Sequence, residues 1–393
     1  MNDFKELIEK SKIIISVGSG GVGKTTTSAA IALQAAMQGK KTIVLTIDPA
    51  KRLANSLGIE MLTNKAQKID LSMLAAPQPP KGGVSKSSPL GERGAGELYA
   101  MMLDMKTAMD DMVDREEKSE EKKKKLLENK IYQTFSTSLS GTQDFAAMEK
   151  LWEISNSGKY DLIVLDTPPT SNTLDFLTFP QRIFDTFDNK ITKLMISMYQ
   201  KSGGFAFKFF GLGTQIVLKG ISKFVGTETL ETLSSFLFHI SNLIEGMKTR
   251  SVDIFNLLRS DDVNFVIVTT PTPVTISDSL YFKEQLEKFN LNFTGFIVNR
   301  YHEKFIDSEK EIDLKEVVNI IKKKEEFASI SEYRIEKLMK KLHKNLKTFN
   351  KLTKIENKHL ELLKDSPYVK IPFFEHDIYN LDGLIKVSKE IFK

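Results

Sequence analysis

Short apolar runs alternate along the chain with longer segments of helical periodicity. The runs are rich in Ile, Val, Leu and Phe, which is typical of strands buried on both faces of a parallel sheet. They comprise residues 13–17, 42–47, 162–165, 265–269 and 293–298. The Ala-rich segment that follows the first run, residues 24–38, ends at Gly39 and predicts a helix. The pattern therefore predicts an α/β fold with a mostly parallel sheet covered by helices.

Three segments depart from this alternation. Residues 75–96 are rich in Pro, Gly and Ser and predict a mobile loop. Residues 176–255 are rich in Phe, Met, Leu and Ile and predict an inserted apolar α-helical subdomain. Residues 303–365 are rich in Lys and Glu, with apolar positions three and four apart, and predict a charged helical hairpin. The predicted α/β core then consists of residues 1–175, 256–302 and 366–393.

Composition narrows the class of protein only slightly. The chain has 393 residues, of which 41% are hydrophobic and 27% charged, and its net charge of +5 does not by itself indicate a nucleic-acid partner. Cysteine is absent, which excludes disulfides and thiolate metal sites. The polar N-terminus and the lack of a long apolar run predict a cytoplasmic protein without a signal peptide or a membrane span.

A phosphate-binding loop is the strongest chemical signal. The segment GSGGVGKT matches the pattern G-x-x-x-x-G-K-[ST] and lies between a predicted strand and a predicted helix. Backbone N–H groups and the helix N-terminus can hold phosphates there, while Lys24 reaches the β and γ phosphates and Thr25 ligates Mg²⁺. The predicted nucleotide contacts are Gly18, Ser19, Gly20, Gly21, Val22, Gly23, Lys24, Thr25 and Thr26. ATP and Mg²⁺ are therefore the expected ligands.

Two aspartates end predicted strands near this loop. Asp166 closes the run YDLIVLD and can serve Mg²⁺, directly or through water. Asp48 follows the second strand and can orient the attacking water. A strand-terminal aspartate can also act only as a helix cap or turn former, and this alternative applies most strongly to Asp48.

These motifs together resemble the ArsA/GET family, the arsenite-pump and tail-anchored-protein-targeting ATPases of the deviant-Walker group that includes MinD and ParA. The resemblance covers nearly the whole chain. It rests on GSGGVGKTTTSAA, LTIDPAKRLANSLG, SGTQDFAAMEKLWEI, YDLIVLDTPPTSNTLDFL, FIVNRY and VKIPFFEHDIYNLDGL. In order and spacing, these segments are similar to the family's phosphate loop, first switch, adjoining loop, second switch, adenine-contacting segment and base-site strand.

The resemblance implies roles for individual residues. Asp48 and Lys24 would be catalytic, with Asp48 polarising the hydrolytic water. Asp166 would serve Mg²⁺ through water. Asn299 would read the adenine, with Pro372 and Phe373 near the base. The family also implies a homodimer that opens and closes with the nucleotide.

Two departures from the family pattern limit which properties of the family can be expected of this chain. The deviant loop usually reads G-K-G-G-V-G-K-T, but the position of its first lysine is Ser19 here. Coupling between protomers through that lysine is therefore in doubt, although Ser19 can donate a hydrogen bond to a phosphate oxygen. The absence of cysteine argues against arsenite export and requires any dimer to close without thiolate zinc.

The apolar insert leaves three interpretations open. In relatives this position forms a groove for a client's transmembrane helix, and flexible Met and Phe surfaces suit such clients. The same residues can instead pack the core of the insert. Peripheral membrane contact through the basic side chains of the insert is the third interpretation. Those side chains are Lys193, Lys201, Lys208 and Lys219.

Two classes of function follow from these observations. The first is an ATP-driven binder of a hydrophobic membrane-protein client. The alternative is a MinD- or ParA-like positioning switch that assembles on a membrane or on DNA. The long Phe- and Met-rich insert favours the first class, and no nucleic-acid partner is expected.

Overall fold

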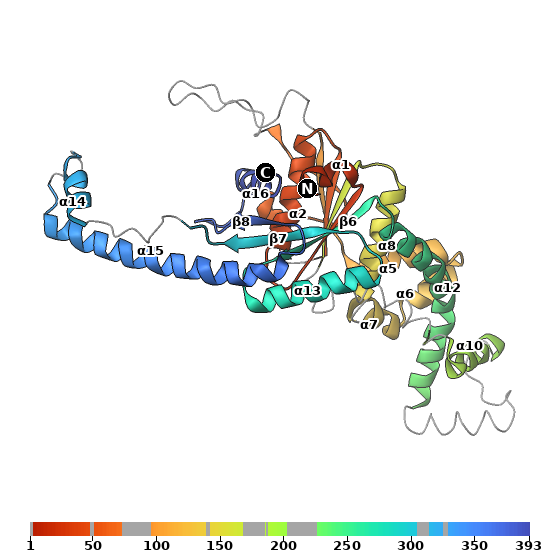
Figure 1. Cartoon of the computed structure of the whole chain (residues 1–393). Coiled ribbons are helices and arrows are strands. Elements are labelled where there is room, and N and C mark those ends of the chain that lie inside the picture. The colour runs from red at the N-terminus through yellow and green to blue at the C-terminus, as the bar shows by residue number, and fades with distance from the viewer. Residues whose placement is uncertain are drawn as a thin grey trace.

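One mostly parallel sheet lies at the centre of the computed structural model (Figure 1). The structure describes residues 3–47, 51–72, 96–138, 142–167, 185, 188–202, 226–304, 314–324 and 329–393. Within these residues the strand order is β3-β4-β2-β5-β1-β6-β7-β8, and neighbouring strands are parallel except β3 and β4. The strands are β1 (Ile13–Val17), β2 (Thr42–Thr46), β3 (Gln67–Lys68), β4 (Leu98–Met102), β5 (Leu162–Asp166), β6 (Val263–Thr269), β7 (Phe293–Tyr301) and β8 (Tyr368–Pro372).

The central strands are buried on both faces, as their unbroken apolar sequences predict. In β1, Ile13 and Ile15 pack into one core cluster and Ile14 packs into the other, and all three are fully buried. This division follows from the two-residue period of a strand, which turns successive side chains to opposite faces. The predicted α/β class is confirmed, with a sheet that is parallel except at its β3 edge.

Helices cover both faces of the sheet. The first face carries α1 (Asp3–Lys10), α2 (Lys24–Met37), α3 (Arg52–Ser56) and α16 (Leu381–Ile391), whose apolar side chains share one core cluster. The second face carries α5 (Met105–Glu116), α6 (Glu120–Leu127), α7 (Lys130–Ser138), α8 (Thr142–Asn156), α12 (Thr227–Leu258) and α13 (Pro273–Lys288). The predicted helix 24–38 is therefore confirmed as α2.

A helical lobe extends from the second face. It is formed by α5 to α8, by α12 and by α10 (Lys190–Ser202), which packs against α12 (Figure 1). The helices α10 and α12 come from the predicted apolar insert, whereas α5 to α8 precede β5 in the sequence. The loop prediction for residues 75–96 falls outside the described residues, apart from Gly96. No helix of the described part is long and apolar enough to cross a bilayer.

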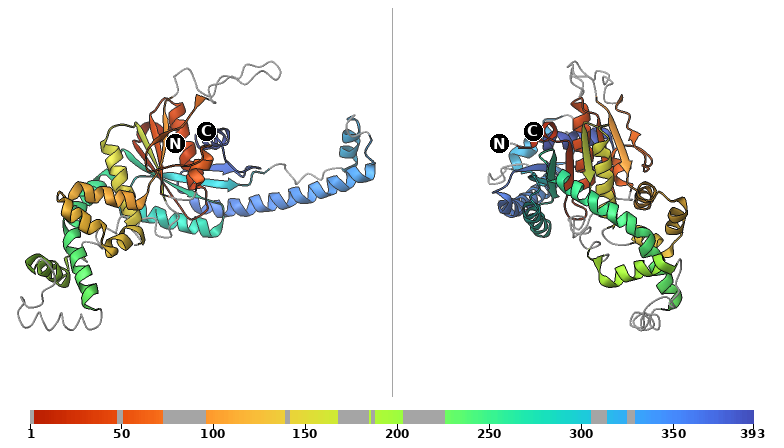
Figure 2. Two further views of the ribbon diagram at one scale, coloured as in Figure 1. Left: turned by 180° about the vertical axis from the view of Figure 1, so that it is seen from behind. Right: turned by 90° about the vertical axis from the view of Figure 1, so that its right-hand side faces the viewer.

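A helical hairpin connects the two last strands. Because β7 and β8 are parallel neighbours, the chain needs a crossover between them. The described part of this crossover contains α14 (Leu314–Lys322), α15 (Glu332–Leu360) and a 3₁₀ turn (Glu361–Leu363). Figures 1 and 2 show α15 leaving the core on the side opposite to α10 and α12, with α14 at its far end.

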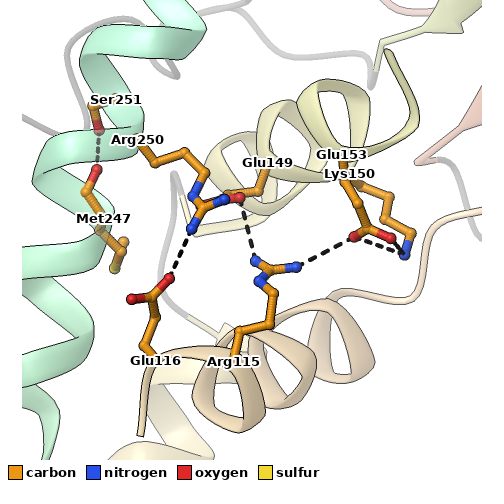
Figure 3. A network of polar contacts seen from close by, with 8 residues as sticks. All are labelled: Arg115, Glu116, Glu149, Lys150, Glu153, Met247, Arg250 and Ser251. Atoms are coloured by element: carbon orange, nitrogen blue, oxygen red, sulfur yellow. Dashed lines mark hydrogen bonds and ion pairs between the residues drawn. The ribbon is translucent and has the colours of Figure 1, made fainter. Parts of the chain in front are cut away.

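A buried ionic network joins three helices of the lobe (Figure 3). Arg250 of α12 lies 2.7 Å from Glu116 and 3.0 Å from Glu149, while Arg115 of α5 lies 3.4 Å from the other Glu149 oxygen. The Arg250 guanidinium also stacks over the ring of Trp152 at 4.5 Å. Since Glu149 is almost fully buried, its two arginine partners hold α5, α8 and α12 together.

This network makes the stability of the fold depend on pH. Burial raises the pKa of Glu149 from 4.5 to about 7, although Arg250 and Arg115 oppose the shift. The folded protein therefore binds the proton more tightly than the unfolded chain, and stability is lost as pH rises from about 4.5 through 7. The loss attributable to this group is roughly 3 kcal/mol.

The Glu149→Gln variant should lack this component. We expect the free energy of unfolding, measured by urea titration from pH 5 to 8, to fall more steeply in the unaltered protein than in the variant. The two proteins should differ least near pH 5, where the buried carboxyl of Glu149 is protonated in the folded protein and the Gln amide resembles it. Parallel pH profiles for the two proteins would contradict the prediction.

Candidate active site

The loop after β1 has a backbone that requires glycine at two positions. Gly18 has a φ of +150°, and a Cβ atom there would lie 2.2 Å from the carbonyl oxygen of Val268 in β6. Gly23 has a φ of +100°, and its Cβ would lie 2.2 Å from the side-chain nitrogen of Asn299. These close approaches explain why the motif places glycine at both ends of the loop. They also show that the backbone of the loop lies directly against β6 at Gly18 and against β7 at Gly23.

The loop leads directly into the N-terminus of α2. Gly23 is the N-cap residue and offers no side-chain cap, and the first turn of α2 contains no acidic residue. Its first N–H groups and the positive end of the helix dipole are therefore suited to an anion such as a phosphate. Lys24 is buried, and its Nζ donates to the carbonyl oxygens of Gly18 at 2.8 Å and Ser19 at 2.9 Å. Its ammonium group thus lies inside the loop.

Thr25 and Asp166 form a pair beside the loop. The Thr25 hydroxyl donates to Oδ2 of Asp166 at 2.7 Å, and the Thr46 hydroxyl donates to the same oxygen at 2.9 Å. Asp166 is the last residue of β5 and is 1% exposed. A hydroxyl and a carboxylate are oxygen ligands of the type that Mg²⁺ prefers. The two residues predicted for the metal are therefore neighbours, and the donor set fits a magnesium ion.

Asn299 lies against the opposite side of the loop. Its side-chain nitrogen donates to the carbonyl oxygen of Val22 at 2.9 Å, and its side-chain oxygen accepts from the N–H of Arg300 at 2.9 Å. Arg300 has a φ of +59°, so the chain turns sharply after Asn299. Asn299 therefore braces the phosphate loop, and its role in adenine recognition stays a prediction.

Pro372 and Phe373 lie at the end of the neighbouring strand β8. Pro372 is paired in register with Tyr301, and the N–H of Phe373 donates to the Tyr301 carbonyl at 2.9 Å. Phe373 is 56% exposed, and its ring stacks on the ring of His302 with 5.1 Å between the ring centres. An exposed aromatic face of this kind can stack on a base, so the prediction for these two residues also stays open.

Ser19 has an intramolecular partner. Its hydroxyl donates to Oδ2 of Asp278 in α13 at 2.7 Å. A hydrogen bond from Ser19 to a phosphate would therefore require this contact to break. Sequence reasoning did not identify Asp278, which is 259 residues away along the chain. Nor did it identify Thr46, whose place at the end of β2 was a usable signal because β2 neighbours β5.

The structure brings most of the predicted site residues together, but it does not describe all of them. The loop 18–26, Asp166 and Asn299 come together at the carboxyl ends of the parallel strands, which is where open α/β sheets bind ligands. Asp48 lies outside the described residues.

A loop of this geometry, with a lysine inside it and a threonine–aspartate pair beside it, defines the class as P-loop ATPases. The chain belongs to the anion-transporting ATPase family, whose model matches residues 11–78 and 92–330. This confirms the resemblance seen in the sequence motifs.

Curated relatives carry the same activity in their names. ATPase GET3C of Arabidopsis thaliana is 26% identical over 306 residues, which cover 76% of this chain and 69% of the relative. ATPase ASNA1 homolog 2 of Paramecium tetraurelia is 26% identical over 309 residues, covering 76% of this chain and 78% of the relative. ATPase GET3B of Arabidopsis thaliana is 26% identical over 307 residues, which cover 76% of this chain and 67% of the relative. The protein is accordingly an ATP hydrolase.

Proposed function

We propose that this ATPase binds Mg-ATP at the loop 18–26 and uses hydrolysis to switch its conformation. Support comes from the convergence of Lys24, Thr25 and Asp166 at one end of the sheet. Lys24 exchanges its carbonyl partners for the β and γ phosphates, because a phosphate oxygen is the stronger acceptor for an ammonium group. A magnesium ion held by Thr25 and, through water, by Asp166 would neutralise phosphate charge during transfer.

Hydrolysis also needs a positioned water molecule. We assign that role to Asp48, on the strength of its place directly after β2 and of the family motif LTIDPAKRLANSLG. Asn299, Pro372 and Phe373 are proposed to receive the adenine. Asn299 lies near the end of β7, Pro372 ends β8 and Phe373 follows it, at the same end of the sheet as the loop. No covalent nucleophile is required, because phosphoryl transfer depends mainly on positioning and charge.

The conformational switch is proposed to bind or target a hydrophobic membrane-protein client, and a homodimer is the expected working form. The observation that carries this proposal is the apolar helical lobe, in which α12 is a 32-residue helix and α10 packs against it. The two helices flank residues 203–225, which contain Phe209 and Phe210. The resemblance to tail-anchored-protein-targeting ATPases favours a client helix over a positioning role.

Capture of an apolar helix tests this client role. We expect the purified protein to retain a synthetic transmembrane-helix peptide in a manner that depends on ATP. Replacing Phe209 and Phe210 by Ser should reduce retention by about tenfold or more, since two aromatic contacts with the client are lost. The matched control replaces two exposed apolar side chains of the hairpin region, Ile320 and Leu362, by Ser.

Two results would count against the client role. Equal retention by the Phe209/Phe210 variant and the control would indicate that these side chains pack the lobe. ATP-dependent sedimentation with membranes or DNA, without retention of the peptide, would instead support the positioning switch. ATP turnover is measured on the same preparations. A variant that loses peptide retention but keeps its turnover has lost client binding alone.

A further inference from the structure

Two aromatic rings stack where the last two strands end. His302 directly follows β7 and Phe373 directly follows β8, and these strands are parallel neighbours. The ring centres lie 5.1 Å apart with 17° between the ring planes, so the two rings are nearly parallel. Phe373 is 56% exposed, which leaves much of the residue open to a ligand. We call His302 and Phe373 the ring pair.

Helix α15 holds His302 at three points. Oε2 of Glu356 accepts from the backbone N–H of His302 at 2.9 Å, and Oε1 of Glu356 lies 2.6 Å from the ring Nδ1. The Thr353 hydroxyl donates to the carbonyl oxygen of His302 at 3.1 Å. Because an ionised carboxylate can only accept, Nδ1 carries the proton in this contact. The contacts therefore fix the orientation of the imidazole as well as the backbone.

Glu356 is buried between α15 and the end of β7. It is 4% exposed, and both of its oxygens contact the same residue, His302, which lies 54 residues earlier in the chain. A buried carboxylate without partners is strongly destabilising, whereas an apolar side chain would fill the same space without that requirement. The carboxylate at this position thus orients His302 in addition to packing the helix.

The ring pair lies near the phosphate loop. His302 follows Asn299 by three residues, so their Cα atoms are at most about 11 Å apart. The Asn299 side chain donates to the carbonyl oxygen of Val22 in the loop at 2.9 Å. A nucleoside whose phosphates lie in the loop can therefore reach the exposed part of Phe373.

We propose that His302 and Glu356 are positioning residues for the nucleobase, because they hold the Phe373 ring in the orientation that stacks on it. These roles rest on the proposed adenine contact of Phe373 and extend it to α15. A ring that is already ordered loses less conformational freedom on binding, so preorganisation by His302 strengthens affinity for the base. Neither residue acts on the phosphates. Their contribution is therefore specific to ligands that carry a base.

Comparison of ADP with inorganic pyrophosphate tests these roles. Both ligands present a diphosphate to the loop with Mg²⁺, but only ADP has a base. The His302→Ala and Glu356→Leu variants should each bind ADP about fivefold more weakly and pyrophosphate within about twofold of the unaltered protein, since one stacked aromatic contact is worth about that much. Isothermal titration calorimetry of the full chain measures both affinities.

Steady-state hydrolysis provides a second measurement on the same variants. The loss should appear in KM for ATP rather than in kcat, because contacts with the base are the same in the ground state and during phosphoryl transfer. A purely structural defect would instead lower kcat as well. Circular dichroism verifies that each variant is folded.

Two further variants separate orientation of His302 from docking of α15. Glu356→Gln should retain ADP affinity within about twofold, because its amide can serve both groups of His302 once the imidazole proton moves to Nε2. Tyr301→Phe removes a hydrogen bond between the same two elements, from the Tyr301 hydroxyl to Asn357 at 3.0 Å. Since it leaves the ring pair intact, ADP and pyrophosphate should bind it as they bind the unaltered protein.

Phe373→Ala distinguishes failure of the adenine contact from failure of the positioning role. This variant should bind ADP about tenfold more weakly while pyrophosphate is unaffected, since stacking of one base on an aromatic ring contributes about that much. If it has no effect, the proposed adenine contact is wrong and the positioning role is wrong with it. If it weakens ADP but His302→Ala and Glu356→Leu do not, the adenine contact stands and the positioning role is overturned.

Two other results would overturn the positioning role. One is an equal loss of ADP affinity in Tyr301→Phe, because a general loosening of α15 would then explain the effect. The other is an equal loss of pyrophosphate affinity in His302→Ala and Glu356→Leu, which would indicate damage to the phosphate loop. A selective loss of ADP affinity in these two variants and in Phe373→Ala, with both affinities retained in Tyr301→Phe, supports the role.

Discussion

Replacing Lys24 by Ala is expected to lower ATP hydrolysis by about 1,000-fold or more, because the buried ammonium group stabilises charge on the transferred phosphate. Its Nζ already lies inside the loop, within hydrogen-bond distance of the carbonyl oxygens of Gly18 and Ser19. Phosphate release under steady-state conditions measures the loss. ATP affinity should also fall, since the ground-state triphosphate contacts the same side chain.

The Lys12→Ala variant is the matched control for this experiment. Lys12 lies just before β1 and forms an exposed ion pair with Asp262, so the variant removes the same charge outside the loop. It should retain nearly full turnover, because exposed ion pairs contribute little to stability. Unchanged hydrolysis in a folded Lys24→Ala protein would refute the assignment of the phosphate loop.

Replacing Asp166 by Asn is expected to reduce hydrolysis by roughly 100-fold or more, since removal of one electrostatic stabiliser costs about that much. The side chain keeps its shape but loses the negative charge next to the hydroxyls of Thr25 and Thr46. The concentration of Mg²⁺ that gives half-maximal turnover should rise, which titration of the metal at saturating ATP measures.

Asp161→Asn provides the comparison. Asp161 lies just before the same strand, at its other end, and accepts from the N–H of Lys41 at 2.8 Å. Its replacement should leave the metal dependence unchanged. If the two variants had the same magnesium response, the pairing of Asp166 with a metal would be wrong.

The sequence was most informative where one local pattern sufficed. Continuous β-branched and Leu-rich runs identified β1, β2, β5, β6 and β7, because strands buried on both faces admit few polar residues. The strand β4, with sequence LYAMM, was not identified from its pattern, since it has no β-branched residue and follows a Pro- and Gly-rich segment. The two-residue strand β3 is too short to give a periodic signal.

The candidate site divides in the same way. Spacing alone identified Lys24 and Thr25, and a strand-terminal position identified Asp166. The contacts of Thr46 with Asp166 and of Ser19 with Asp278 join positions 120 and 259 residues apart, so they depend on strand order and helix placement. Local patterns do not encode such contacts, which explains why Asp278 emerged only from the fold.

The contact between Ser19 and Asp278 alters the charge balance offered to the nucleotide. A lysine at position 19 would have supplied a second cation, whereas here a carboxylate lies 2.7 Å from the serine hydroxyl. Lys24 is the one cationic side chain of the segment 18–25. Most of the negative charge of a bound triphosphate must therefore be balanced by divalent cations that bind together with it. ATP affinity is consequently expected to follow the concentration of divalent cations more steeply than in a loop with two lysines.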